Sequence, residues 1–205
     1  MPINFERIMA IGAHPDDIEL GCFGTLAKFR DSGSAVAFVV LTYGGVNGDK
    51  ETRKKEAEES AALLSAKCYF GGLNDTEIPE GNPTIKIIED AINDFKPTAI
   101  FINSKNDTHQ DHRNAANAAI SASRFVPTVL FYQTPSSNRS FTPQVFVDIT
   151  DTIKIKLEST KIHSSQGDNV YMADRAIEGL SEFLGLQIYR SSRYFEGFEI
   201  HQIII

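Results

Sequence analysis

The chain has 205 residues, of which 41% are hydrophobic and 23% are charged, and its formal net charge is −7. This is an ordinary globular composition, the length suits one α/β domain over residues 1–205, and the acidic balance disfavours nucleic acid as a partner. Two cysteines are too few for a disulfide framework and suit a reducing compartment. With no signal-peptide pattern and no apolar run near the roughly 20 residues of a membrane span, we expect a cytoplasmic protein.

Apolar runs alternate with segments of helical period along the chain. The predicted strands are 7–13, 35–43, 67–70, 99–103, 129–133 and 145–148, and residues 198–205 alternate as an added edge strand would. The predicted helices are 19–30, 52–66, a helix capped by Asn82 and ended at Lys96-Pro97, 113–123, 151–163 and 172–189. This alternation predicts an α/β fold, with a single doubly wound, Rossmann-like, mostly parallel sheet and helices on both faces.

Three linking segments are long enough to attract attention: 43–51, 71–83 and 135–143. Loops of this length in a compact domain are more often functional than idle. The first two follow predicted strands at the edge of the sheet where residues 7–13 also end. We therefore expect these two loops to line a cleft at that edge.

Polar side chains follow the first predicted strand in a His-Pro-Asp-Asp motif that runs from His14 to Asp17. The carboxyl ends of strands are where open α/β sheets bind their ligands. Taken alone, the motif is equally compatible with a turn in which Pro15 fixes φ and an aspartate caps the next helix. A second observation is needed to separate the two interpretations.

That observation is a His-x-Asp-His motif, His109 to His112, after the predicted strand 99–103. Two strand ends that both carry histidine and aspartate favour a shared metal site over two unrelated caps. Zinc hydrolases hold the metal with three protein ligands and leave a position open for water, and His14, Asp17 and His112 meet that count. A bound divalent ion lowers the pKa of water to about 7, and Asp16, surplus to the ligand count, is placed to act as general base.

Together the two motifs resemble the LmbE/PIG-L family of metal-dependent de-N-acetylases. The resemblance covers most of the chain and includes Gly24-Thr25, Arg53, residues 161–166 (Lys-Ile-His-Ser-Ser-Gln) and residues 196–198 (Glu-Gly-Phe). It implies a hydrolase that removes the N-acetyl group of an N-acetylglucosamine-type amino sugar or its conjugate. It also implies one bound metal ion, zinc or else iron or cobalt, and a homo-oligomer, either a trimer or a hexamer.

Residue by residue, the resemblance implies zinc at His14, Asp17 and His112, with Asp16 as the general base. It implies that His109 faces the developing oxyanion or protonates the leaving amine.

The remaining implied roles are supporting ones. Asp111 is expected to orient a histidine through a hydrogen bond. Arg53 is expected to contact sugar hydroxyls or a phosphate, although a surface arginine near a helix start would look the same. His163 is expected near the substrate, and a histidine that stabilises a helix C-terminus explains it equally well.

Three other functions compete with the hydrolase. A non-haem iron oxygenase uses two histidines and a carboxylate but does not need Asp16. A receiver-type phosphoacceptor domain places aspartates after its first strand but does not need His14 or His112. A catalytically silent paralogue that binds metal and sugar would keep most of the motif. The loop at 44–50 is shorter than in better-known members and residues 71–81 are more acidic, so the identity of the sugar stays open.

Overall fold

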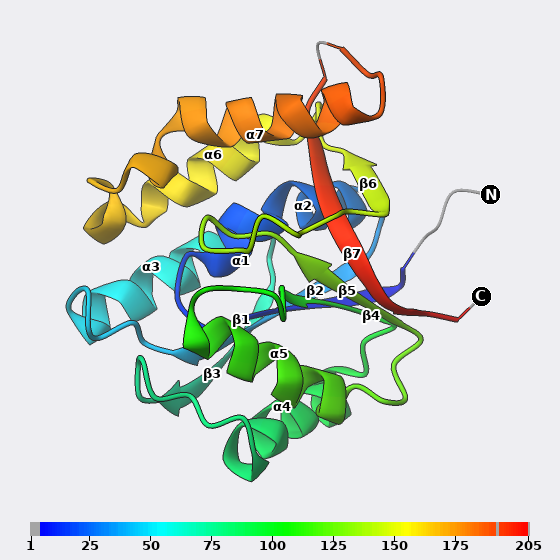
Figure 1. Cartoon of the computed structure of the whole chain (residues 1–205). Coiled ribbons are helices and arrows are strands. Elements are labelled where there is room, and N and C mark those ends of the chain that lie inside the picture. Colours follow the sequence, from blue (N-terminus) through cyan, green and yellow to red (C-terminus); the bar gives the residue numbers. More distant parts are fainter. Residues whose placement is uncertain (1–4, 192, 205) are drawn as a thin grey trace.

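The computed structural model describes residues 5–191 and 193–204 of the chain, in which a seven-stranded sheet is covered by helices (Figure 1). The sheet has the order β3-β2-β1-β4-β5-β7-β6. Its strands are β1 (Arg7–Gly12), β2 (Ala35–Thr42), β3 (Lys67–Leu73), β4 (Ala99–Asn103), β5 (Thr128–Tyr132), β6 (Val145–Asp148) and β7 (Phe195–Ile203). The strands from β1 to β5 pair in parallel, whereas β7 pairs antiparallel with both β5 and β6. The predicted mostly parallel α/β sheet is confirmed.

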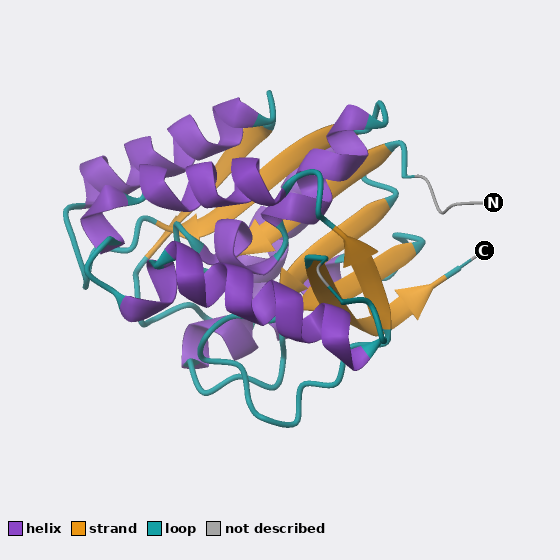
Figure 2. Ribbon diagram, turned by 90° about the horizontal axis from the view of Figure 1, so that it is seen from above, coloured by secondary structure: helices purple, strands orange, loops and turns teal. Residues whose placement is uncertain are grey.

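Helices cover both faces of the sheet. They are α1 (Asp17–Gly21), α2 (Phe23–Asp31), α3 (Lys50–Leu63), α4 (Asn82–Phe95), α5 (Gln110–Ala122), α6 (Ile153–Ile162) and α7 (Asp174–Gln187), with short 3-10 turns η1 (Ser164–Gln166) and η2 (Val170–Met172). Helices α4 and α5 lie on one face and the other helices on the opposite face (Figure 1), where Figure 2 shows them passing over the strands. Within the described ranges, no helix is both long and apolar enough to cross a membrane.

The central strands are apolar on both sides because each side meets a helical layer. Along β1, Met9 and Ile11 belong to the core under α4 and α5, whereas Ile8 and Ala10 belong to the core under α1, α2 and α3. Successive side chains of a strand point to opposite faces, so a strand between two layers must be continuously apolar. This is why the sequence predicted β1, β2 and β4 well.

The predicted helix 19–30 is wrong, because the chain forms two helices that break at Cys22. The backbone of Cys22 has φ −147° and separates α1 from α2. A Cβ on Gly21 would lie 2.1 Å from the ring of Tyr132, so α1 sits close against β5. The new N-terminus of α2 is bound by the carboxylate of Glu196, which accepts hydrogen bonds from the N–H groups of Gly24 and Thr25 at 3.0 and 2.7 Å. A partner so distant in sequence leaves no local signal.

Two other helices begin earlier than predicted because side chains cap them. Asp49 accepts a hydrogen bond from the Thr52 N–H at 2.9 Å, and α3 begins at Lys50. His109 caps α5 in the same way, as described below. The predicted Asn82 cap is wrong, because Asn82 is the first residue of α4 and the residue before it, Gly81, takes the extended capping conformation.

The prediction of an added edge strand at 198–205 is also wrong. Strand β7 begins at Phe195 and lies inside the sheet, between β5 and β6, while β6 takes the edge. Its first half is buried, and Phe198 packs edge-to-face on Phe101 with ring centroids 4.9 Å apart. The second half of β7 is more open, and Ile200 and His201 are both exposed. Residue 205 of the predicted strand lies outside the described residues.

Candidate functional site

A cavity of about 170 Å³ opens beyond the carboxyl ends of β1 and β4. All three long loops contribute to its wall, through Asn47, Asp75 and Ser136, so the prediction that the loops at 43–51 and 71–83 line a cleft is confirmed. The lining residues are His14, Asp16, Asp17, Leu20, Asn47, Arg53, Asp75, Thr76, His109, His112, Thr134, Pro135, Ser136, Gln166 and Tyr171.

The loop after β1 presents His14 with one ring nitrogen held by carboxylates. His14 Nε2 lies 3.0 Å from Asp111 Oδ2 and 3.1 Å from Asp75 Oδ1. Burial alone would lower the pKa of His14, but the hydrogen bonds to Asp111 and Asp75 raise it to about 9. With the proton of Nε2 donated to these carboxylates, the other ring nitrogen, Nδ1, faces Asp17 Oδ2 at 3.7 Å.

His112, in the first turn of α5, is held in the opposite sense. Its Nδ1 lies 3.2 Å from Asp107 Oδ2, and its Nε2 lies 3.2 Å from Asp17 Oδ1. Burial opposes protonation here too, but the charge of Asp17 and the hydrogen bond to Asp107 raise the pKa of His112 to about 10. The two histidines therefore point opposite ring nitrogens at the same carboxylate.

Asp17 lies between these two rings and is buried. Burial would raise its pKa, but the charges of His112 and His14 lower it well below the usual range. Its Oδ2 also accepts a hydrogen bond from the His14 backbone N–H at 2.9 Å, which holds the carboxylate in the turn.

This donor set fits a divalent metal ion. His14 Nδ1, Asp17 and His112 Nε2 converge, and the other nitrogen of each histidine faces a carboxylate. Metal-binding histidines almost always donate this second N–H, to a carboxylate, a backbone carbonyl or water. A metal takes the place of protons on such ligands. The raised pKa values of both rings reflect the carboxylates that surround them.

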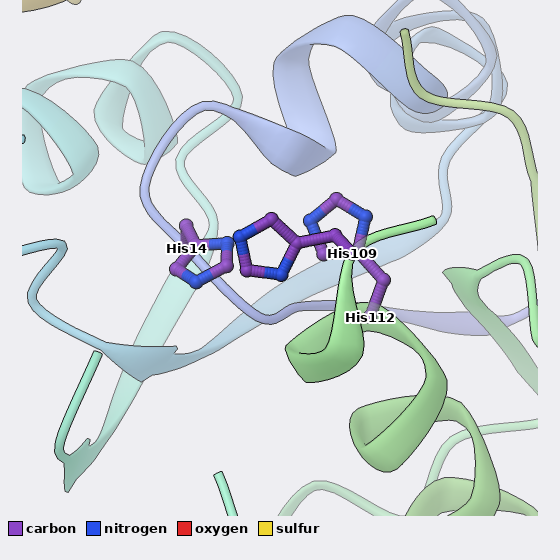
Figure 3. A group of neighbouring side chains, drawn as sticks. All are labelled: His14, His109 and His112. Atoms are coloured by element: carbon purple, nitrogen blue, oxygen red, sulfur yellow. The ribbon is translucent and has the colours of Figure 1, made fainter. Parts of the chain in front are cut away.

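His109 completes a group of three imidazole rings that Figure 3 shows side by side. Its ring centroid lies 4.7 Å from that of His14 and 4.7 Å from that of His112, and the three offer ring nitrogens within 4.8 Å of one another. However, His109 caps α5, because its Nδ1 accepts a hydrogen bond from the Asp111 N–H at 3.2 Å.

That cap decides what His109 can do. Burial lowers its pKa, and so do the charges of His14 and His112. In the neutral ring with Nδ1 as an acceptor, the proton resides on Nε2. A protonated Nε2 donates a hydrogen bond and does not ligate a metal, so this geometry separates His109 from the two other histidines.

Asp16 lies beside the ligand set in a strained backbone conformation. Its φ of 102° is in a region that residues with a side chain rarely adopt, and the residue is buried. Burial raises the pKa of Asp16 to about 6, although the nearby Arg53 charge opposes the change. A carboxyl group with a pKa this near neutrality is suited to accept and release a proton at physiological pH.

Arg53 is buried rather than on the surface. Its Nη1 donates to the Gly44 carbonyl at 3.0 Å, and its Nη2 donates to the Pro15 carbonyl at 2.6 Å and lies 3.4 Å from Asp16 Oδ1. Gly44 has a φ of +66°, and a Cβ there would lie 2.2 Å from Nη1. Arg53 lines the cavity, and its two hydrogen bonds to backbone carbonyls join the loops after β1 and β2.

The structure does not bring His163 into the cavity lining. The ring is fully buried behind α1, and its Nε2 lies 3.2 Å from Glu19 Oε1. Glu19 also accepts a hydrogen bond from the Ser60 hydroxyl. The other predicted site residues, Asp111 excepted, line the cavity directly, and Asp111 reaches it through His14.

Sequence reasoning missed two carboxylates that hold the histidines, Asp75 and Asp107. Asp107 stands just before the second motif, and Asp75 lies in the acidic loop that departs from the family pattern. A usable signal existed, because metal-binding histidines usually donate their second N–H to a carboxylate. With Asp111 expected to orient one histidine, a search for one partner per ligand histidine would have drawn attention to Asp107, whereas Asp75 is a second partner of His14.

The chain is similar to known deacetylases in sequence and in fold. The sequence model of PIG-L, described as GlcNAc-PI de-N-acetylase, matches residues 9–123. The chain is 36% identical over 169 residues to an uncharacterized deacetylase, YaiS, of Escherichia coli K12, covering 78% of this chain and 91% of that protein. It is 29% identical over 198 residues to the diacetylchitobiose deacetylase of Thermococcus kodakarensis, covering 80% and 72%. The solved structure of N,N'-diacetylchitobiose deacetylase from Pyrococcus horikoshii has a TM-score of 0.83 at 27% identity, covering 96% and 84%.

Proposed function

This chain belongs to the PIG-L family of de-N-acetylases, and on that premise we propose that it hydrolyses the acetamide bond of an N-acetylglucosamine-type amino sugar or its conjugate. The products are acetate and the free amine. The observation that carries the proposal is Asp17 between His14 Nδ1 and His112 Nε2, with Asp16 and His109 on the same cavity wall.

The metal ligands we propose are His14, Asp17 and His112, and zinc is the ion we expect, with iron or cobalt as alternatives. When bound, the ion supplies a water of lowered pKa and polarises the amide carbonyl. Asp111 keeps the proton of His14 on Nε2, which leaves Nδ1 free to ligate. The donor types and their supporting carboxylates favour zinc, because imidazole and carboxylate form its usual catalytic sites.

The chain's own groups carry the proton transfers. Asp16 accepts a proton from the attacking water as the water oxygen bonds to the carbonyl carbon. His109 Nε2–H donates a hydrogen bond to the oxyanion that forms, which is where a fixed donor accelerates acyl transfer most. As the C–N bond breaks, Asp16 returns the proton that it took from the water to the nitrogen, and the amine leaves.

Arg53 and His163 receive different roles in this proposal. Arg53 holds Asp16 and the Pro15 carbonyl in place, and its position in the cavity wall supports contact with a sugar hydroxyl. His163 supports the site from behind, since its charge is near Asp16 and its ring is outside the cavity lining. Direct contact between His163 and the substrate has no support in this arrangement.

The test is acetate release from N-acetylglucosamine and from diacetylchitobiose by the purified protein. The protein is assayed as isolated, after chelation, and after zinc is restored. Asp16→Asn serves as the inactive variant, and Asp94→Asn, an exposed carboxylate on α4, serves as the matched control. We expect activity to be lost on chelation and to return with zinc. Bound metal below about a tenth of an equivalent after zinc is restored would refute the metal site, given the affinity of such centres. A zinc-loaded protein that releases no acetate would instead favour the alternative function, a catalytically silent paralogue.

Three further proposals rest on the sequence and the resemblance. We propose that residues 1–205 form one deacetylase domain, that the enzyme is cytoplasmic, and that it forms a trimer or a hexamer. Sedimentation of the purified chain tests the last of these.

A further inference from the structure

Asp107 contacts two histidines of the proposed active site and has no role in the proposed reaction. It lies between β4 and α5 and is 2% exposed. Its Oδ1 accepts a hydrogen bond from the backbone N–H of His109 at 2.8 Å, and its Oδ2 lies 3.2 Å from His112 Nδ1. One carboxylate therefore contacts both histidines of the second motif, and it does so through different oxygen atoms.

Two hydroxyl groups also hold this carboxylate, at the same oxygen that faces His112. Thr134 Oγ1 and Ser137 Oγ each donate a hydrogen bond to Asp107 Oδ2 at 3.0 Å. Both residues lie just after β5, and the backbone of Ser137 forms an isolated bridge with Asp107. Because the hydroxyl protons are given to Asp107, Thr134 approaches His112 Nδ1, at 3.4 Å, only as an acceptor.

These contacts bear on which nitrogen of His112 keeps a proton when a metal binds. Both ring nitrogens face a carboxylate, Nδ1 at Asp107 Oδ2 and Nε2 at Asp17 Oδ1, each at 3.2 Å. With a metal at Nε2, the remaining ring proton would stay on Nδ1, where Asp107 Oδ2 accepts it. At the same time, Oδ1 fixes the backbone at His109, whose ring caps α5. An amide in place of this carboxylate offers an N–H to Nδ1 and thereby favours the proton on Nε2, where a metal should bind.

We propose that Asp107 is a positioning residue that sets the tautomer of His112 through Oδ2 and the placement of His109 through Oδ1, with Thr134 and Ser137 holding it in register. This inference rests on the proposed function, because it assumes that His112 is a metal ligand. It assigns to one side chain two separable effects, one on metal affinity and one on turnover.

The experiment compares Asp107→Asn, Asp107→Ala and the control Asp94→Asn by zinc affinity in chelator competition. Asp107→Asn should bind zinc about 10–100-fold more weakly than wild type, the usual effect of removing a ligand's hydrogen-bond partner, and Asp94→Asn should not. At saturating zinc, Asp107→Ala should have a lower kcat than Asp107→Asn, because only the amide still accepts the His109 N–H. The Nδ1 proton of His112, observed by NMR in the zinc-loaded wild type, should exchange faster in Asp107→Asn.

A second pair guards against a variant that fails to fold. Thr134→Val removes one donor to Asp107 and should weaken zinc binding, whereas Thr134→Ser keeps the hydroxyl and should match wild type. If wild type binds zinc and both Asp107→Asn and Thr134→Val bind it equally well, this inference is wrong and the proposed function stands. If wild type itself binds no zinc, this inference is wrong, and so is the zinc site of the proposed function.

Discussion

Lys156 offers a sharp test of how the site is supported, because it is a buried ammonium with three partners. It lies on α6 and is 2% exposed. Its Nζ donates to the carbonyls of Glu19 and Leu20 at 3.0 and 2.8 Å, and to Glu196 Oε1 at 2.6 Å. The two carbonyls belong to α1, the helix that begins at Asp17. We predict that Lys156→Met destabilises the fold strongly while leaving the side-chain length nearly unchanged.

The structure sets the size of this effect. Removing one partner of a buried ion pair costs about 3–5 kcal/mol, because the other charge stays buried. Glu196 keeps its hydrogen bonds from the N–H groups at the start of α2, which partly offset the loss. We therefore expect the lower part of that range, about 3–4 kcal/mol. At about 2–4 °C per kcal/mol for a chain of this size, Tm should fall by about 6–16 °C.

The assay is urea unfolding followed by circular dichroism, with thermal unfolding alongside it. Lys161→Met on the same helix is the matched control, since Lys161 is exposed, pairs with Asp174, and should matter little. The double variant Lys156→Met with Glu196→Gln should lose less than the two single variants together, because no unpaired charge is left buried. The reasoning is refuted if Lys156→Met is no less stable than Lys161→Met.

Three further outcomes are expected. Asp16→Asn should lower turnover at least about a hundredfold, the usual contribution of a general base, with metal content near normal by elemental analysis; loss of metal with full activity per bound ion would mean that Asp16 and Asp17 have exchanged roles. His109→Ala should cost about 2.7–4 kcal/mol of activation free energy, lowering kcat and kcat/KM together in steady-state kinetics, whereas a large rise in KM alone would indicate a substrate-holding role. The pKa of Glu19 is lowered despite its burial, by the charge of His163, and the pKa of His163 is raised despite its burial, by Glu19. Their contribution should be complete between about pH 4.5 and 6.5, then fall as acid protonates Glu19 and as base deprotonates His163. Urea unfolding of wild type and Glu19→Gln across pH checks this window, and a pH-independent difference would contradict it.

The central strands were predictable from sequence, but the antiparallel end of the sheet was not. Residues 99–103 are apolar on both faces, and the predicted strand matches β4. Alternating hydrophobicity, as in residues 198–205, indicates that one face of a strand is buried. It does not indicate which strands pair with that strand. The place of β7 is decided by pairings such as Leu130 with Ile200 and Val145 with Phe198, which are distant in sequence.

The candidate site divides in the same way. His14, Asp17 and His112 were predicted to converge because two motifs follow two strands whose ends meet at one edge. Of the carboxylates behind them, Asp111 was expected to orient a histidine and contacts His14, but Asp75 and Asp107 were not predicted, since they are identified by contact rather than by spacing. His163 was ambiguous because a histidine near a helix C-terminus looks the same whether it faces solvent, a substrate or, as here, a buried glutamate.

The position of β7 has a consequence for the order in which the chain can fold. Within the described sheet β6 has no other neighbour, so a strand that is finished at residue 148 stays unpaired until residues 195–203 have been synthesised. Glu196, which binds the start of α2, arrives equally late. Pairings between distant segments are slow to form and leave strand edges exposed meanwhile. No residue of β7 lines the cavity. Even so, the helices that follow Asp16 and Asp17 lack the contact between Glu196 and the start of α2 until β7 has been synthesised.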